Sequence, residues 1–196
     1  MLRRSLVIMM ALVGSLAVAP SMLMAETSTE TASQKEKLFQ TLKQAPTERD
    51  GRLAENAIWM WWLDQAPTPE VREAVDRGME RRESYDFEAA EAALDIAVRE
   101  APTYAEGWNQ RAFVRFLRDN VEGALSDLEM AVDLEPDHFA AWSGMYHVLM
   151  RTGRPEAAIA ALSKAVTIHP WLKERGMLPP DPDAKRPAIK GKQQDL

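Results

Sequence analysis

The sequence contains no cysteine, which excludes a disulfide framework, a thiolate nucleophile and a cysteine-ligated zinc or iron–sulfur site. It also lacks an excess of positive charge, because 24 lysine and arginine residues stand against 30 aspartate and glutamate residues. Proteins that bind nucleic acid need a basic surface to neutralise phosphates, so we expect no nucleic-acid partner. The chain has 196 residues, of which 46% are hydrophobic and 28% are charged. This composition is typical of a globular protein.

Common catalytic and metal-binding motifs are also lacking. The sequence has no G-x-S-x-G, no glycine-rich phosphate loop and no H-E-x-x-H. Its three histidines, His138, His147 and His169, include no pair at the i, i+3 or i, i+4 spacing of a helical metal site. We expect His138 and His169 to lie in loops, beside prolines. We therefore predict no catalytic residue, no cofactor and no metal site, and a protein that is not an enzyme.

The N-terminus has the pattern of an export signal. Arg3 and Arg4 precede an uncharged run, Ser5–Ala25, that is rich in Leu, Val, Met and Ala. This predicts a signal peptide over residues 1–25 and a periplasmic location for the mature chain. The run is about as long as a membrane-spanning helix, so an uncleaved inner-membrane signal anchor is the alternative, and we expect membrane contact only in that case. The polar residues 26–36 predict a flexible leader.

A period of 34 residues organises the middle of the chain. Pro102, Pro136 and Pro170 are spaced at this interval, and other residue types recur with them. If repeats begin at Val71, Ala105 and Phe139, small residues recur at positions 20 and 27, and a leucine recurs at position 24. The recurring residues are Ala90, Ala124 and Ala158; Ala97, Ala131 and Ala165; and Leu94, Leu128 and Leu162. Trp108 and Trp142 share position 4 of the second and third repeats.

These residues resemble the tetratricopeptide repeat, and the chain is similar to small exported repeat proteins of Gram-negative bacteria. The resemblance implies an all-α fold, a right-handed α-solenoid of three helical hairpins with an N-terminal capping helix pair. The predicted segments are the capping hairpin at 37–66, the repeats at 71–104, 105–138 and 139–170, and a short cap with a proline-rich mobile tail at 171–196.

Helix starts are marked by capping residues. Thr68, Asp86 and Asn120 each stand where a side-chain oxygen can accept a backbone N–H of the first turn. Thr103 and Glu106 have the spacing of a capping box.

Helical geometry also predicts a binding surface. At 100° per residue, positions 2, 5, 9, 12 and 13 of each first helix lie opposite the core positions. In tetratricopeptide repeat proteins this arc forms a concave face that receives a peptide or helix, and here its centre is apolar. The residues that we assign to this partner-binding groove are Val75, Met79, Asn109, Gln110, Phe113, Phe116, Ser143, His147 and Met150. Arg82 and Arg151 belong to the same arc. Coverage of the groove by the chain's own N-terminal hairpin or tail is the alternative.

One ligand class known for tetratricopeptide repeat proteins does not match the residues of this groove. Its chaperone adaptors hold an acidic peptide C-terminus with a clamp that combines lysine, arginine and asparagine side chains. The matching positions here are Val75, Met79, Gln110, Ala140 and Gly144, none of them a cation. A terminal carboxylate would find no charged partner at these positions, so we reject this ligand.

Tryptophans gather at one place upstream of the repeats. Trp59, Trp61 and Trp62 lie in a helical segment that is apolar nearly all round and so must be buried on two sides. We expect a cap between the first repeat and the preceding helix, with a second interface for a partner as the alternative.

The sequence therefore predicts a non-enzymatic protein-interaction module or scaffold of the periplasm, which binds a protein or peptide. The alternatives are a self-associating structural protein and a non-catalytic subunit of an envelope enzyme complex. A homodimer would form if the second helix of the last repeat exposed Ile159, Leu162 and Val166.

Overall fold

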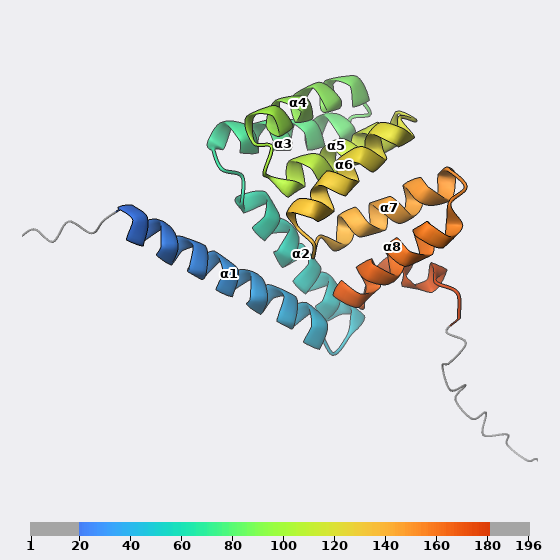
Figure 1. Ribbon diagram of the computed structural model, residues 1–196, viewed down its shortest axis with the longest axis horizontal. Helices are drawn as coiled ribbons and strands as arrows, with labels where there is room; N and C mark the ends of the chain where they lie inside the picture. The colour runs from blue at the N-terminus through green and yellow to red at the C-terminus, as the bar shows by residue number, and fades with distance from the viewer. Residues whose placement is uncertain (1–19, 181–196) are drawn as a thin grey trace, which may run out of the picture. The chain divides into compact units, whose positions relative to one another are not determined.

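The computed structural model describes residues 20–180, which form α-helices and one short 3₁₀ helix and no strand (Figure 1). The helices are α1 (Pro20–Gln44), α2 (Glu48–Asp64), α3 (Pro69–Glu83), α4 (Phe87–Glu100), α5 (Ala105–Leu117), α6 (Val121–Leu134), α7 (Phe139–Arg151), α8 (Pro155–Ile168) and η1 (Lys173–Met177). Residues 1–19 of the predicted signal peptide and 181–196 of the predicted tail lie outside the described residues.

The chain divides into two units, Met1–Lys37 and Leu38–Leu196. In the first unit, the prediction of a flexible leader over 26–36 needs correction, because α1 continues through this segment. The sequence between Ser21 and Gln44 has no proline or glycine and many strong helix formers, which accounts for the helix. Within residues 20–180, no helix combines the length and the apolar character needed to cross a bilayer.

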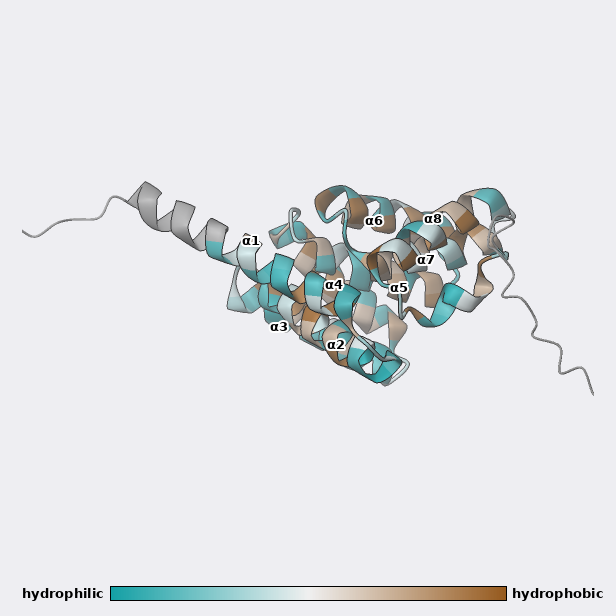
Figure 2. Cartoon of the chain, turned by 90° about the horizontal axis from the view of Figure 1, so that it is seen from below, coloured by the Kyte–Doolittle hydropathy of each residue, from teal (hydrophilic) through white to brown (hydrophobic). Residues whose placement is uncertain are grey.

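Three consecutive helical hairpins form most of the second unit. They are α3 with α4, α5 with α6 and α7 with α8, and neighbouring hairpins pack through α4 against α5 and α6 against α7. Figure 2 shows hydrophobic residues, in brown, alternating with hydrophilic residues, in teal, along these helices, as amphipathic packing requires. The predicted all-α solenoid fold is confirmed.

Small residues allow the two helices of a hairpin to cross closely. Ala90, Ala124 and Ala158, at position 20 of the repeats, are fully buried. In the first hairpin, a Cβ atom added to Gly78 would lie 2.5 Å from Leu94 Cγ, so α3 and α4 approach to a distance that only glycine permits. The repeated Ala and Leu positions are thus explained by packing.

The predicted capping residues agree with the structure in three places. Thr68, Asp86 and Asn120 each accept a backbone N–H three residues further on, at distances of 3.0 to 3.3 Å. The capping box of Thr103 and Glu106 is wrong. Tyr104, and not Thr103, is the N-cap of α5, and it makes no side-chain capping bond. The Glu106 side chain does not bond back to the helix start, because it is buried and bonded elsewhere.

Helix α2 contacts the ends of all three hairpins. The Tyr104 hydroxyl, after α4, donates to the carbonyl oxygen of Trp62 at 3.1 Å. The ring of His138, after α6, stacks on the indole of Trp62 with 3.9 Å between centroids and 5° between planes. The ring of His169, after α8, has its Nε2 atom 3.2 Å from a carboxylate oxygen of Glu55. His138 and His169 lie in loops, as expected, and contact with α2 leaves both side chains fully buried.

The N-terminal end of α2 reaches the far end of the solenoid. A Cβ atom on Gly51 would lie 2.4 Å from Trp171 Cγ, so glycine is required for this close approach. Beside it, the guanidinium of Arg175 lies 3.4 Å from a carboxylate oxygen of Glu48. Helix α2 therefore runs along the three hairpins instead of stacking on the first as an N-terminal cap, and the prediction of a capping pair at 37–66 is corrected.

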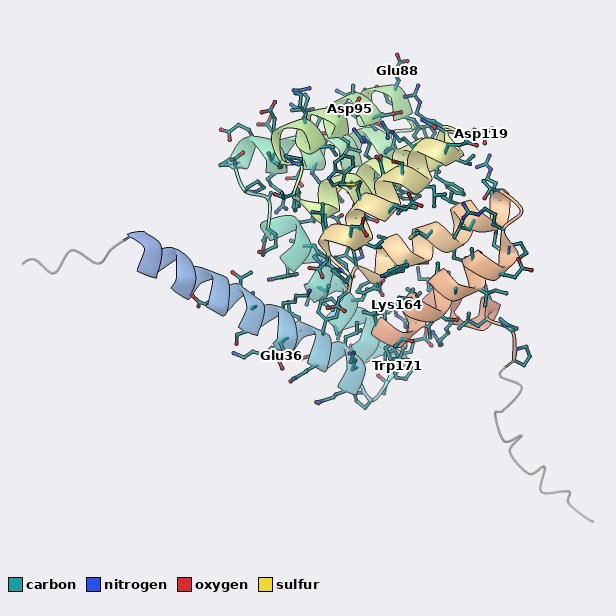
Figure 3. All side chains as sticks on the ribbon, viewed as in Figure 1. Glu36, Glu88, Asp95, Asp119, Lys164 and Trp171 are labelled. Atoms are coloured by element: carbon teal, nitrogen blue, oxygen red, sulfur yellow. The ribbon has the colours of Figure 1, made fainter. Side chains whose placement is uncertain are left out.

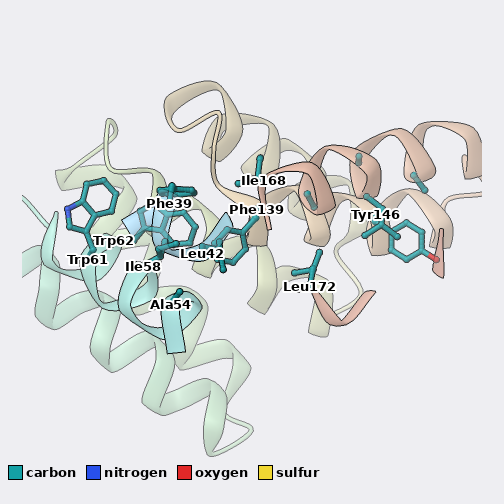
Figure 4. Close-up of a cluster of buried hydrophobic side chains, with 14 of the residues drawn as sticks. Phe39, Leu42, Ala54, Ile58, Trp61, Trp62, Phe139, Tyr146, Ile168 and Leu172 are labelled. Atoms are coloured by element: carbon teal, nitrogen blue, oxygen red, sulfur yellow. The ribbon is translucent and has the colours of Figure 1, made fainter. Parts of the chain in front are cut away.

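The largest buried cluster lies where the end of α1, helix α2 and the third hairpin meet (Figure 4). It contains Phe39, Ile58 and Trp62 from the N-terminal side, and Phe139 and Leu162 from the third hairpin. A helix that is apolar nearly all round is thus buried on two sides, as the sequence requires. Most of its packing partners belong to the third hairpin and not to the first.

The outer face of α8 is largely covered by residues that follow it. Leu162 is fully buried in one cluster with Leu172, and Leu178 packs against that cluster. Ile159 and Val166 are half-buried. The apolar end that would favour a homodimer is therefore small, and self-association stays a prediction.

An ionic network joins α4, α5 and α6 on the side away from α2. Asp127 is 2% exposed and accepts bonds from both Arg111 and Arg115 at 2.7 to 2.9 Å. The same two arginines lie 2.8 and 3.9 Å from Asp95, whose side chain is 48% exposed. Asp95 is labelled on α4 in Figure 3. Burial opposes ionisation of Glu91, but its hydrogen bonds to arginines outweigh this and hold the pKa of Glu91 below its ordinary value.

Candidate binding groove

The first helices of the hairpins, α3, α5 and α7, line an open groove with a volume of about 480 Å³. Its floor is mostly apolar, and its polar groups are few. The lining residues are Trp59, Met79, Arg82, Asn109, Gln110, Ala112, Phe113, Phe116, Leu128, Ala140, Ser143, Gly144, His147, Val148 and Glu174. A groove of this size, apolar with a small number of polar side chains, is typical of ligand-binding sites.

Most of the residues assigned from the sequence lie together in this groove. Those that line it are Met79, Asn109, Gln110, Phe113, Phe116, Ser143 and His147. Val75 does not, because it is fully buried in a cluster that joins α3, α4 and α5 with Leu63 of α2, and its assignment is corrected. Met150 is exposed but lies outside the groove lining, so its role in partner binding stays a prediction.

The groove is bordered, but not filled, by the chain's own flanking helices. Trp59 of α2 forms part of its wall, and Glu174 of η1 lies at its edge. Phe113 remains 49% exposed. Within residues 20–180, coverage of the groove by the N-terminal hairpin or by η1 is therefore only partial.

The predicted second interface at Trp59, Trp61 and Trp62 is also corrected. Trp61 and Trp62 are 7% and 3% exposed and belong to the chain's own core. Only Trp59 is half-buried, and it faces the groove. A helix that packs on two sides leaves no tryptophan cluster free for a partner, so Trp59 joins the groove site.

A guanidinium stands over an aromatic ring on the α3 wall. The Arg82 Cζ atom lies 4.8 Å from the centroid of the Phe113 ring, which is a cation–π contact. One Arg82 nitrogen donates to the side-chain oxygen of Gln110 at 2.5 Å. Burial lowers the pKa of Arg82 from its ordinary value, because a partly dehydrated cation is disfavoured.

Behind this wall lies a buried carboxylate. Glu106 is 1% exposed and accepts bonds from Gln110 at 2.6 Å and Asn109 at 3.3 Å. His138 Nε2 lies 2.9 Å from the carboxylate oxygen that accepts from Asn109. Because His138 Nδ1 accepts the backbone N–H of Ala141, its ring proton is on Nε2 and is donated to Glu106. This chain of bonds fixes the orientation of the two groove amides, Asn109 and Gln110.

The opposite rim has a different charge pattern. Arg151 lies over the Phe116 ring at 5.1 Å and forms an ion pair with Asp119. His147 Nε2 lies 3.9 Å from a carboxylate oxygen of Glu174. Arg151, unlike Arg82, thus has a carboxylate partner. The groove edge at η1 carries the acidic side chain of Glu174.

Several groove-lining residues were not among those assigned to the groove from the sequence, and three of them, Trp59, Arg82 and Glu174, are aromatic or charged. Arg82 was placed on the concave arc but was not assigned to the binding groove. Trp59 and Glu174 belong to no repeat, so no period could place them beside α5 and α7.

The chain is similar to known proteins in sequence and in fold. A TPR repeat-containing protein of Rhizobium etli is 33% identical over 144 residues, which cover 71% of this chain and 69% of that protein. Among solved structures, the first TPR of Spaghetti (RPAP3) bound to the HSP90 peptide SRMEEVD has a TM-score of 0.53 and 17% identity, and covers 54% of this chain and 83% of its own. The TPR2B domain of yeast Sti1 in a pHsp70 complex has a TM-score of 0.51 and 22% identity, covering 52% and 81%. No protein-family model matches the chain.

Proposed function

The chain belongs to the tetratricopeptide repeat family, and from this premise we propose that it is a non-enzymatic interaction module that binds a partner peptide or helix in its concave groove. The observation that carries the proposal is the groove itself. It places Phe113, half exposed, in an apolar hollow of about 480 Å³ that the chain's flanking helices border without filling. Exposed aromatic side chains in a concave, apolar setting are typical of protein-binding hot spots.

Polar groups of the groove support a peptide as the ligand. Asn109 and Gln110 are held in place by the buried Glu106, so their side-chain amides need little reordering on binding. The Asn109 bond to Glu106 uses its side-chain nitrogen, so its side-chain oxygen can accept a peptide N–H, whereas both ends of the Gln110 amide already bond within the chain. The Spaghetti domain, which shares the fold at low identity, is bound to a peptide.

Replacing both Phe113 and Phe116 by Ala is expected to weaken partner binding at least tenfold, because two aromatic contacts are lost from the groove floor. The mature chain would be used for a pull-down from envelope extract, with captured proteins identified by mass spectrometry and the affinity of each measured by calorimetry. The matched control is Leu53→Ala with Met60→Ala, which removes two exposed apolar side chains of α2 outside the groove. Equal weakening by both double variants would argue against the groove as the binding site.

We further propose that the chain acts in the periplasm, after export by the signal peptide at residues 1–25. The support is the pair of arginines followed by an uncharged apolar run. Expression of the full chain in a Gram-negative host, followed by fractionation and N-terminal sequencing, is expected to recover a periplasmic protein that begins at Glu26. Recovery of the intact N-terminus in the inner membrane would favour the signal anchor, and recovery in the cytoplasm would contradict export.

A further inference from the structure

Within residues 20–180, Arg82 differs from the other half-buried arginines in having no carboxylate partner. Among residues 20–180, the half-buried arginines other than Arg82 are Arg72, Arg111, Arg115 and Arg175. Each has a carboxylate oxygen within 4.0 Å. No carboxylate of the described chain lies within that distance of Arg82, which donates to the neutral side chain of Gln110 instead. A partly dehydrated guanidinium usually has an acidic partner, because an unpaired buried charge is costly.

Two carboxylates, Glu83 and Glu106, act on Arg82 electrostatically, but neither forms an ion pair with it. Glu106 bonds to the amide nitrogen of Gln110, and the amide oxygen of Gln110 accepts from Arg82. Glu106 is itself buried and also bonds Asn109 and His138, so it cannot turn to pair with the guanidinium. Arginine has five N–H donors, and this arrangement occupies one of them on the protein side. Arg82 lines the groove.

We propose that the occupant of the groove is a peptide segment that brings one acidic side chain, Asp or Glu, to Arg82, next to a bulky apolar side chain that packs on Phe113 and Phe116. This rests on the proposed function and names the chemistry that the groove selects. The planar fork of a guanidinium matches a carboxylate with two parallel hydrogen bonds. Phe113 lies beneath the guanidinium and beside the apolar floor, so both contacts can be made by neighbouring residues of one peptide.

The charges around the groove favour a single internal acid over a peptide C-terminus. A C-terminal acidic residue brings two carboxylates, whereas the α3 wall offers one unpaired guanidinium. On the opposite rim, Arg151 is already paired with Asp119. At the η1 edge, Glu174 would repel a second negative charge. The acid is therefore expected at the α3 end of the groove and nowhere else along it.

The test uses an array of short synthetic peptides, acetylated and amidated so that side chains carry the only carboxylates. Peptides that bind the mature wild-type chain are remade with each Asp or Glu changed to Asn or Gln, and affinities are measured for wild type and Arg82→Gln. The matched control is Arg154→Gln, which removes an exposed arginine that also has no carboxylate partner among the described residues and lies outside the groove lining. Circular dichroism checks that all three proteins have the same helix content.

For wild type and Arg154→Gln, changing the critical acid to its amide is expected to lower affinity about tenfold, and for Arg82→Gln less than twofold. An acid preference that persists in Arg82→Gln, or peptides bound without any acid, would overturn the assignment of Arg82 while leaving groove binding intact. A preference that appears only in peptides with a free C-terminus would overturn the choice of an internal acid. Binding of no peptide to wild type would contradict the proposed function as well.

Discussion

Replacing Asp127 by Asn is expected to lower the free energy of unfolding by about 3–5 kcal/mol, the range for breaking one partner out of a buried ion pair. The Asp127 carboxylate is 2% exposed and accepts hydrogen bonds from both Arg111 and Arg115. Asn preserves the shape of the side chain but not its charge. The two largely buried arginines would keep only their more exposed partners, Asp95 for Arg111 and Glu91 for Arg115. Loss of the buried charge that both arginines share is the reason for the large expected effect.

The matched control is Asp95→Asn. Asp95 lies within 4.0 Å of the same two arginines, but its side chain is 48% exposed, so solvent screens the interaction. Its replacement is expected to cost less than about 1 kcal/mol. Urea unfolding followed by circular dichroism measures both variants on the same scale. If the two substitutions cost the same, burial does not decide the strength of this network.

The second large effect is expected for Trp62→Ala, which should destabilise the chain by about 3–5 kcal/mol. Trp62 is 3% exposed and stacks on the His138 ring, with Phe39 and Phe139 at 6.1 and 4.9 Å between ring centroids. Truncation removes these contacts and opens a cavity between α2 and the third hairpin. The surrounding helices cannot close it fully because their own contacts hold them apart.

Trp59→Ala serves as the comparison for Trp62→Ala. It removes the same type of side chain from the same helix, but Trp59 is half-buried at the groove wall, so the expected loss of stability is smaller. The two variants are compared by thermal and urea unfolding, with limited proteolysis to detect release of α2. Equal destabilisation by the two substitutions would mean that the stacking on His138 does not anchor the helix.

The repeats were predictable because their packing is periodic. One set of Ala and Leu positions, such as Ala90 and Leu94, satisfies the same helix crossing three times, so the period of 34 residues marks the hairpins before any contact is known. The concave arc followed from helical geometry alone. It placed Phe113, Phe116 and His147 on the surface that the structure hollows into a groove.

The position of α2 was not predictable in the same way. Its tryptophans showed that it must be buried on two sides, but nothing periodic indicates that its partners are His138, Phe139 and Trp171, far away in the sequence. The burial of His138 and His169 was not foreseen for the same reason. Each was judged from its own repeat, while α2 covers it from outside the repeats.

The path of α2 along the solenoid has a consequence for how the chain folds. Repeat arrays with contacts only between neighbours can unfold one repeat at a time from either end. Here Glu48 meets Arg175 across 127 positions of sequence, and α2 also contacts the loops after α4, α6 and α8. Such long-range closure raises the contact order, slows folding and couples the repeats into one cooperative transition. During synthesis the α2 contacts with the third hairpin therefore cannot form until that last hairpin has been made, although the helices themselves can form earlier.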